Sequence, residues 1–150
     1  MPITIRKANI DDLLKTFEWA NEKEVIKNSI KRSKKVEINE HSTWFKKYIT
    51  LRLSSLFVVS LRGEKIGLVR IDCKKKEFFL SYLIDRKKRN KGYGYQMLNK
   101  IIKKFRNKKK VFKARVKKDN LASNAIFIKL GFKIKYTNQN KNTFLYRLET

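Results

Sequence analysis

The pattern of apolar and polar residues along the chain predicts a mixture of strands and helices. Seven short segments are apolar and rich in β-branched or aromatic residues, which is typical of strands. They cover residues 3–6, 56–61, 66–72, 77–85, 111–116, 132–136 and 144–148. Apolar residues three and four positions apart predict helices over residues 13–19, 39–48, 93–105 and 121–130. The segment 22–33 is more polar and predicts a loop with a short helical turn.

Capping and turn residues mark the ends of several of these segments. Asp11 or Asp12, and also Asn39, are candidate N-caps for the first two helices. Residues 62–65 predict a hairpin turn, and Gly131 predicts a left-handed cap at the end of a helix. Antiparallel hairpins followed by a β-loop-α-β-α unit predict an α/β (α+β) fold. We expect a mixed, mostly antiparallel sheet of six to seven strands with helices on both faces.

Length and composition narrow the class of protein. A chain of 150 residues suits one core, so we expect residues 1–150 to form a single domain. No apolar run approaches the ~18 residues that span a bilayer, and residues 1–6 do not resemble a signal peptide. Cys73 is the only cysteine and His41 the only histidine, so neither a disulfide nor a metal site is expected. These features predict a cytoplasmic protein with no membrane partner.

The formal net charge of +26 has two explanations. Lys and Arg neutralise phosphates, so the charge could indicate a nucleic-acid partner. Lys, Ile and Asn also share A/T-rich codons, so genome composition could supply much of the charge. Because the basic residues are scattered along the chain, we favour composition. Under either explanation, a positive field attracts anionic ligands.

A basic loop between a strand and a helix carries the clearest candidate binding site. In residues 83–94 a strand ends, Arg89 and Lys91 follow, and a helix begins around Gly92 and Gly94. The first turn of a helix has backbone N–H groups without internal partners, and the helix dipole favours an anion there. The two glycines would let a pyrophosphate approach the main chain closely. Taken alone, however, this spacing is also typical of an ordinary helix cap.

Two segments together resemble the GNAT superfamily of N-acetyltransferases. The family pattern Gln/Arg-x-x-Gly-x-Gly/Ala stands complete at Arg89, Gly92 and Gly94. The second segment, residues 120–132, begins with Asn, has a small residue three positions later and ends in Leu-Gly-Phe. The resemblance implies a GNAT-like fold, acetyl-CoA as co-substrate, and transfer of the acetyl group to a primary amine.

The resemblance also implies which residues hold acetyl-CoA. Amides of the glycine-containing loop would bind the pyrophosphate, and the end of the preceding strand would pair with the pantetheine arm. The predicted cofactor-binding residues are Leu83, Ile84, Asp85, Arg89, Asn90, Lys91, Gly92, Tyr93, Gly94, Asn120, Ser123 and Phe127. A backbone N–H near Leu83 or Ile84 would polarise the thioester carbonyl. Asn120 has a second interpretation as a helix N-cap.

The general acid and base are harder to assign. Many relatives place a Tyr seven residues after the motif Asn, where this chain has Phe127, which we interpret as a packing residue beside the cofactor. Losing a general acid costs about 10²–10⁴ in rate unless another group replaces it. The strand offers Glu77, Ser81 and Tyr82 as bases, and His41 has an ordinary pKa suited to proton transfer. We predict His41 and Ser81 as catalytic, although a lone histidine on a helix is more often structural.

The N-terminal half forms the acceptor site in relatives. The predicted substrate-binding residues are Trp19, Asn21, Asn28, Ser29, His41 and Trp44. Aromatic rings could stack on a sugar or a base while amides and hydroxyls bond its polar groups. The alternative for Trp44 is packing of its helix on the sheet. The pattern resembles a branch that acetylates amino-sugar nucleotides of the pseudaminic-acid type, and also resembles ribosomal-protein N-acetyltransferases.

Three hypotheses for the function follow. The leading one is an enzyme, monomeric or homodimeric, that acetylates a 4-amino sugar nucleotide, an anionic small molecule. The second is an acetyltransferase for protein N-termini, of the ribosomal-protein type. The third is a basic nucleic-acid-binding module that keeps the fold without catalysis. Phe127 in place of the usual Tyr favours the third hypothesis, and the complete Arg89 to Gly94 motif opposes it.

Overall fold

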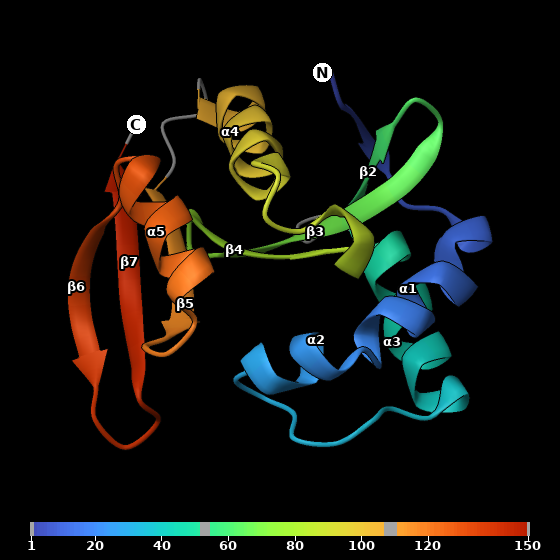
Figure 1. Cartoon of the computed structure of the whole chain (residues 1–150), viewed down its shortest axis with the longest axis horizontal. Helices are drawn as coiled ribbons and strands as arrows, with labels where there is room; N and C mark the ends of the chain where they lie inside the picture. Colours follow the sequence, from blue (N-terminus) through green and yellow to red (C-terminus); the bar gives the residue numbers. More distant parts are fainter. Residues whose placement is uncertain (1, 52–54, 107–110, 150) are drawn as a thin grey trace.

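The seven predicted strands form one twisted sheet in the computed structural model, which describes residues 2–51, 55–106 and 111–149. The strand order is β1-β2-β3-β4-β5-β7-β6 (Figure 1). The strands are β1 (Thr4–Lys7), β2 (Ser55–Leu61), β3 (Glu64–Lys74), β4 (Glu77–Ile84), β5 (Val111–Lys117), β6 (Lys133–Asn138) and β7 (Thr143–Glu149). Neighbours run antiparallel except β4 and β5, which are parallel. The predicted mixed, mostly antiparallel sheet is confirmed.

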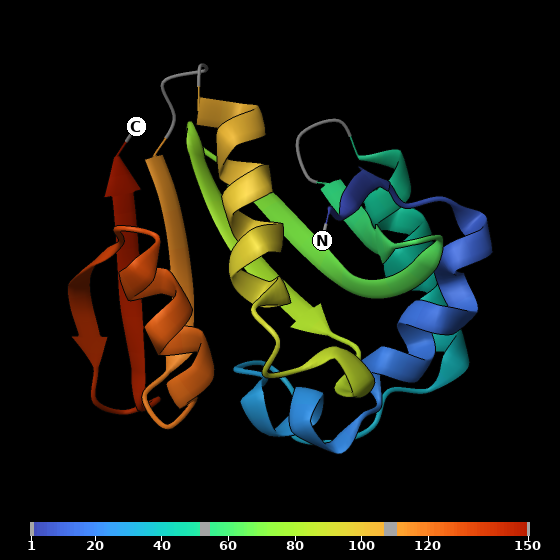
Figure 2. The same ribbon diagram turned by 45° about the horizontal axis from the view of Figure 1, so that its top comes forward.

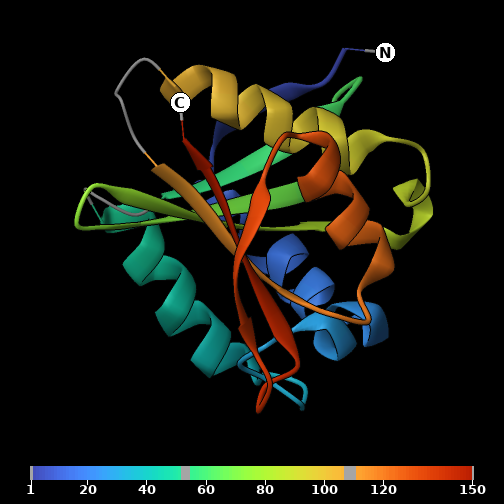
Figure 3. The same cartoon turned by 90° about the vertical axis from the view of Figure 1, so that its left-hand side faces the viewer.

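Helices cover both faces of this sheet, as predicted. They are α1 (Leu13–Ala20), α2 (Lys23–Asn28), α3 (Ile38–Thr50), α4 (Tyr93–Phe105) and α5 (Leu121–Lys129), with short 3-10 turns η1 (Ile10–Asp12) and η2 (Arg86–Lys88). Helix α4 lies on one side of the sheet and α3 on the other (Figure 3). The parallel β4–β5 pair needs a crossover connection, and α4 supplies it.

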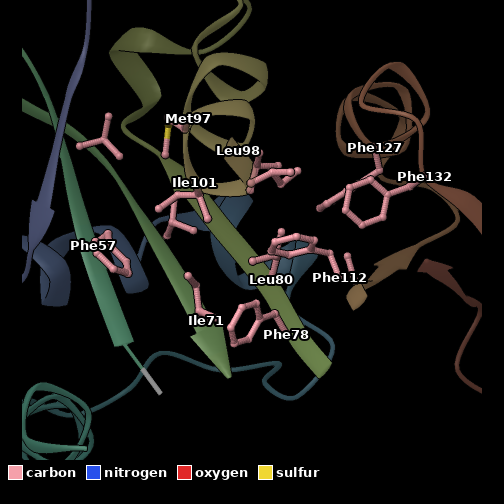
Figure 4. Close-up of a cluster of buried hydrophobic side chains, with 14 of the residues drawn as sticks. Phe57, Ile71, Phe78, Leu80, Met97, Leu98, Ile101, Phe112, Phe127 and Phe132 are labelled. Carbon is pink, nitrogen blue, oxygen red and sulfur yellow. The ribbon is translucent and has the colours of Figure 1, made fainter. Parts of the chain in front are cut away.

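The larger core lies between the sheet and helices α4 and α5. Met97, Leu98 and Ile101 of α4 pack over sheet residues such as Leu80 and Phe112 (Figure 4). A smaller apolar cluster on the opposite face joins two helices to β2 and β3. Its buried members are Trp19, Phe45, Leu56, Val58 and Leu68. The sheet is therefore buried on both faces near β2 and β3.

Two predicted helix caps were wrong. Asn9, and neither Asp11 nor Asp12, accepts the capping hydrogen bond at the first helical turn. Helix α3 begins at Ile38 after an extended Glu37, so Asn39 lies inside its first turn. The predicted turn at residues 62–65 is tighter than expected, since β3 already begins at Glu64. The left-handed residue at Gly131, with φ of 95°, is confirmed.

Asp12 is used for an ion pair that ties the first turn to the sheet. Its carboxylate is fully buried and accepts hydrogen bonds from the Arg6 guanidinium at 2.8 and 2.9 Å and from the Asn9 backbone N–H at 2.9 Å. The Lys65 ammonium lies 2.7 Å away. Burial by itself would raise the pKa of this carboxyl, but the bonds from Arg6 and Lys65 hold it well below its usual range.

We expect Asp12→Asn to lower the free energy of unfolding by about 2 kcal/mol at pH 7, because it leaves Arg6 and Lys65 without their buried partner. A depressed folded-state pKa adds stability above the unfolded pKa of about 3.9 and loses it as pH falls toward the folded value. Below about pH 4, the free energy of unfolding of the variant should therefore fall less steeply than that of wild type. Urea unfolding at pH 7 and pH 3 measures both effects. Asp11→Asn is the control, and equal pH dependence in Asp12→Asn and wild type would contradict the expectation.

Candidate active site

Strands β4 and β5 pair over a short stretch and then separate (Figure 2). Their register covers only Glu77–Phe79 against Val111–Lys113. Beyond Phe79, the edge of β4 that faces β5 has no strand partner within the described ranges. Unpaired main-chain groups on a strand edge can pair with an extended ligand. The stretch from Leu80 to Ile84 is therefore a candidate binding edge.

The β4–α4 turn (residues 85–92) ends in a concave row of amides. Asn90 and Gly92 have positive φ values of 61° and 84°. Within the described part of the chain, the backbone N–H groups of residues 89–95 donate to no protein acceptor, and the first helical bond runs from Gln96 to the Gly92 carbonyl at 3.3 Å. Successive free N–H groups at the start of a helix form an anion site. A pyrophosphate fits this donor set.

The two glycines of the motif have different roles. A Cβ added at Gly92 would meet nothing within 4 Å, so the space above it is open to a ligand. A Cβ at Gly94 would lie 2.8 Å from Ile126 and 3.1 Å from Ile84. Gly94 therefore lets α4 pack against α5 and β4, and the prediction that it opens the main chain to a pyrophosphate is corrected.

We expect Gly94→Ala to lower the free energy of unfolding by about 1–3 kcal/mol, because the added methyl overpacks this contact. Ile126→Val removes the Cδ1 atom that the new methyl would meet. The double variant Gly94→Ala/Ile126→Val should therefore lose less stability than the two single losses added together. Urea denaturation of the four proteins measures the coupling. Strictly additive losses would show that Gly94 has another role.

Arg89 is paired with protein groups and is not a free cation. Its Nε donates to the Ile84 carbonyl at 3.1 Å, and its guanidinium lies 2.9 Å from the Glu22 carboxylate. The expectation that Arg89 adds positive charge to the turn is corrected, because Glu22 balances that charge. The side chain instead joins the start of α2 to the end of β4. Lys91 is exposed and keeps its predicted position beside the turn.

The main chain of Asp85 is also occupied. Its N–H donates to the Ile66 carbonyl and its carbonyl accepts from the Lys88 N–H, both at 2.8 Å. Both main-chain groups of Asp85 thus already have a protein partner, and its pairing with the pantetheine arm stays a prediction. The Asp85 carboxylate accepts from the indole N–H of Trp19 at 2.9 Å. Trp19 is only 1% exposed, so the prediction that it stacks on a substrate is wrong.

His41 is a packing residue between α1 and α3. The imidazole is buried, its Nε2 lies 2.9 Å from the Thr16 hydroxyl, and its ring stacks on Phe45. Burial lowers the pKa of His41 below its ordinary value. The predicted roles of His41 as catalytic base and substrate ligand are therefore corrected. Trp44, half-buried on α3, lies against Tyr48 with ring centroids 4.9 Å apart, which supports its packing alternative.

The polar residues predicted for the acceptor shape the loop after α2. The Asn21 side chain bonds both main-chain groups of Val36, at 2.8 and 3.0 Å. Both polar atoms of the Asn21 side chain therefore have protein partners, and the predicted contact of Asn21 with the substrate is corrected. The Ser29 hydroxyl accepts from the Arg32 N–H at 3.2 Å, and Asn28 is the last residue of α2. Asn28 and Ser29 remain half-buried at the end of that helix.

The start of α5 faces the separated strands. Asn120 caps the helix by accepting from the Ser123 N–H at 3.3 Å, so its N-cap interpretation is confirmed. Phe127 is 1% exposed and stacks on Tyr146 with ring centroids 5.7 Å apart. Phe127 is therefore part of the core, as its packing interpretation predicts. The buried Asn124, which the sequence analysis missed, accepts from the Tyr146 hydroxyl at 2.6 Å.

Tyr82 and Ser81 point to opposite faces of β4. The Tyr82 ring meets Phe127 edge-on at 6.1 Å between centroids. Burial raises the pKa of Tyr82, and the Ser123 side chain opposes that shift. Ser81 is half-buried and stands opposite Arg70 of β3. Tyr82 thus places its ring beside Phe127.

A separated β4–β5 pair beside an anion-binding turn fits an extended ligand that carries a pyrophosphate. The family model described as Acetyltransferase (GNAT) domain matches residues 3–133, and the chain belongs to this family. It is therefore an N-acetyltransferase with acetyl-CoA as co-substrate. A search of the curated proteins found no significant match.

Solved structures share this fold at low sequence identity. A domain from Methanocaldococcus jannaschii has a TM-score of 0.90 at 20% identity, with 99% of each chain covered. The spermidine N-acetyltransferase of Vibrio cholerae, in complex with CoA and spermine, has a TM-score of 0.84 at 15% identity, covering 99% of this chain and 94% of that one. The ribosomal-protein α-N-acetyltransferase RimL with CoA has a TM-score of 0.87 at 15% identity, covering 98% and 93%. Identities this low show the fold alone.

Among the helices of residues 2–51, 55–106 and 111–149, none has the length and apolarity to cross a membrane. In the same ranges, no group of three His, Cys, Asp or Glu side chains is placed to hold a metal ion.

Proposed function

We propose that this enzyme transfers the acetyl group of acetyl-CoA to the amine of a 4-amino sugar nucleotide. The cofactor site is supported by one observation: in the described part of the chain, the backbone N–H groups from Arg89 to Tyr95 have no protein acceptor. These N–H groups bind the pyrophosphate, and the open space above Gly92 admits it. Leu83 and Ile84 offer the strand edge to the pantetheine arm, and Asn120 and Ser123 stand on its other side.

The β4 edge also supports the chemistry of transfer. A backbone N–H near Leu83 or Ile84 stabilises the oxyanion that develops on the thioester carbonyl. The Tyr82 hydroxyl, beside Phe127, donates a proton to the departing thiolate. Ser81, on the opposite face of β4, orders a water that receives the proton of the amine. Holding both substrates along one strand supplies much of the remaining rate.

The charge of the chain supports an anionic acceptor. With a net charge of +26, the protein repels polycationic amines and attracts amines carried on phosphorylated molecules. A protein N-terminus with acidic residues is the second candidate, because it has the same sign of charge. The free amides of the turn argue against a module that only binds nucleic acid, since such a module has no need of a pyrophosphate site.

Thiol release from acetyl-CoA in the presence of different amines tests the proposal. A UDP-linked 4-amino sugar, a peptide with an acidic N-terminal sequence and spermidine are compared at equal concentration. We expect turnover with the nucleotide sugar and none with spermidine. Turnover with the peptide alone would move the assignment to the second candidate.

Binding of the co-substrate is tested separately by thermal shift. Acetyl-CoA should raise the Tm, because a ligand that binds only the folded state stabilises it. An unchanged Tm at millimolar acetyl-CoA would overturn the pyrophosphate site in the β4–α4 turn.

A further inference from the structure

The sheet face that carries α1 and α3 changes character beyond β4. Its apolar cluster joins β2 and β3 to the helices and reaches Leu83 at the edge of the cluster. Further along the same face, Phe79 stands opposite Asp72 of β3, whose carboxylate accepts from the Tyr48 hydroxyl of α3. Lys113 and Arg147 are the next cross-strand neighbours, on β5 and β7. The face therefore passes from apolar to basic.

Three cations surround the ring of Phe79. The guanidinium carbon of Arg115 lies 4.6 Å from the ring centroid, and the ammonium groups of Lys113 and Lys74 lie at 5.9 and 6.0 Å. A guanidinium over an aromatic face is favourable and holds the planar group in a fixed orientation. Residues from three strands thus build one cationic cluster, which we call the Phe79 cluster (Lys74, Phe79, Lys113 and Arg115).

The nearby acidic groups neutralise only one cation of this cluster. Glu77 pairs with Lys113 at 2.7 Å, and other carboxylates on the face pair with their own arginines. Within the described residues, Arg115 and Lys74 have no carboxylate within 4 Å. Arg115 is also exposed, so its N–H donors face solvent. Two cations held against one ring, without a counter-charge, favour an anionic ligand.

The position of the cluster connects it to the transfer site. Phe79 is the last residue of β4 that pairs with β5, and the separation of the strands begins directly after it. Leu83 lies four residues further along the same strand and on the same face. At about 3.3 Å per residue, the two positions are roughly 13 Å apart. One extended small molecule can reach both.

We propose that the Phe79 cluster binds the phosphate groups of the acceptor, with Arg115 as the principal ligand. This inference rests on the proposed function, since it places the nucleotide part of the same acceptor. The Arg115 guanidinium, oriented by the Phe79 ring, donates hydrogen bonds to two phosphate oxygens at the same time. Lys74 adds a point charge beside the same group, whereas the charge of Lys113 is balanced by Glu77. The cluster selects amines that carry phosphate and rejects polycationic amines.

Calorimetric titration with UDP, in the presence of saturating CoA, tests this site. CoA fills the β4–α4 turn, so UDP reports on a second anion site. We expect Arg115→Ala to weaken UDP binding about tenfold, the loss typical of a charge-assisted hydrogen bond. Arg115→Lys should fall between wild type and Arg115→Ala, because it keeps the charge and loses the fork. The control is Lys103→Ala, which removes one exposed charge from α4 on the opposite face.

The outcomes separate the two proposals. Weaker UDP binding in Arg115→Ala with unchanged CoA affinity supports the Phe79 cluster. Equal UDP affinity in wild type, Arg115→Ala and Lys103→Ala overturns it, as does an absence of UDP binding to the CoA-loaded wild type. Failure of CoA itself to bind overturns the proposed function instead. Phe79→Leu adds a further check, since it keeps every charge and should still weaken UDP binding by releasing Arg115.

Discussion

Replacing Gly92 with alanine should weaken binding of CoA by about 10- to 100-fold, the effect of losing one or two charge-assisted hydrogen bonds. The added methyl projects into the open space above the β4–α4 turn, where nothing lies within 4 Å. The methyl meets no atom of the protein, but it would clash with a pyrophosphate seated on the amides. Titration calorimetry with CoA measures the loss directly.

Gly63 provides a matched control for this experiment. Its φ of 80° is close to the 84° of Gly92, and a Cβ there also meets nothing within 4 Å. Both alanine variants therefore incur the same left-handed strain, of about 1–2 kcal/mol. Gly63 lies in the β2–β3 turn, away from the β4–α4 turn, so Gly63→Ala should bind CoA normally. A similar loss of affinity in both variants would mean that strain, and not the phosphate site, explains the result.

Tyr82→Phe should lower kcat about 10²–10⁴-fold, the range for removal of a general acid. The variant keeps the ring that packs edge-on against Phe127. It removes only the hydroxyl that we assign to the departing thiolate. Steady-state thiol release under saturating substrates gives kcat. Tyr136→Phe on β6 is the control, because it deletes an exposed hydroxyl at the far edge of the sheet and should keep full kcat.

The affinity for CoA adds a readout that does not depend on turnover, and the pH dependence of the rate adds a second test. Wild type should bind CoA more tightly than desulfo-CoA, and Tyr82→Phe should narrow that difference. Burial raises the pKa of Tyr82 above its ordinary value of about 10, so the hydroxyl stays protonated and able to donate throughout neutral and mildly alkaline solution. The wild-type rate should therefore show no alkaline decline from Tyr82 below about pH 10. Undiminished kcat in Tyr82→Phe would reject the assignment.

The features of the fold that the sequence predicts correctly are mostly local ones. Helix α4 runs from Tyr93 to Phe105, the range expected from its apolar spacing. The positive φ value at Gly131 also follows from the position of glycine at a helix C-terminus. Each of these features depends on residues within one or two turns of chain, so no distant contact could alter them.

Predictions about individual side chains were less successful where distant partners decide. Trp19 bonds Asp85, which is 66 residues away, and Asn21 bonds Val36 across a loop. Such pairings depend on how the helices dock on the sheet, and no spacing in the sequence encodes them. For the same reason the sequence analysis missed Arg115 stacked on Phe79, since the two residues meet only through the parallel pairing of β4 and β5.

The link from Glu22 through Arg89 to the Ile84 carbonyl joins the start of α2 to the strand beside the proposed cofactor site. A phosphate that bonded the Arg89 guanidinium would compete with Glu22 for it and would weaken this link. Binding of CoA would then change the affinity for any ligand held near α2, and thermodynamic reciprocity requires that ligand to change the affinity for CoA by the same factor.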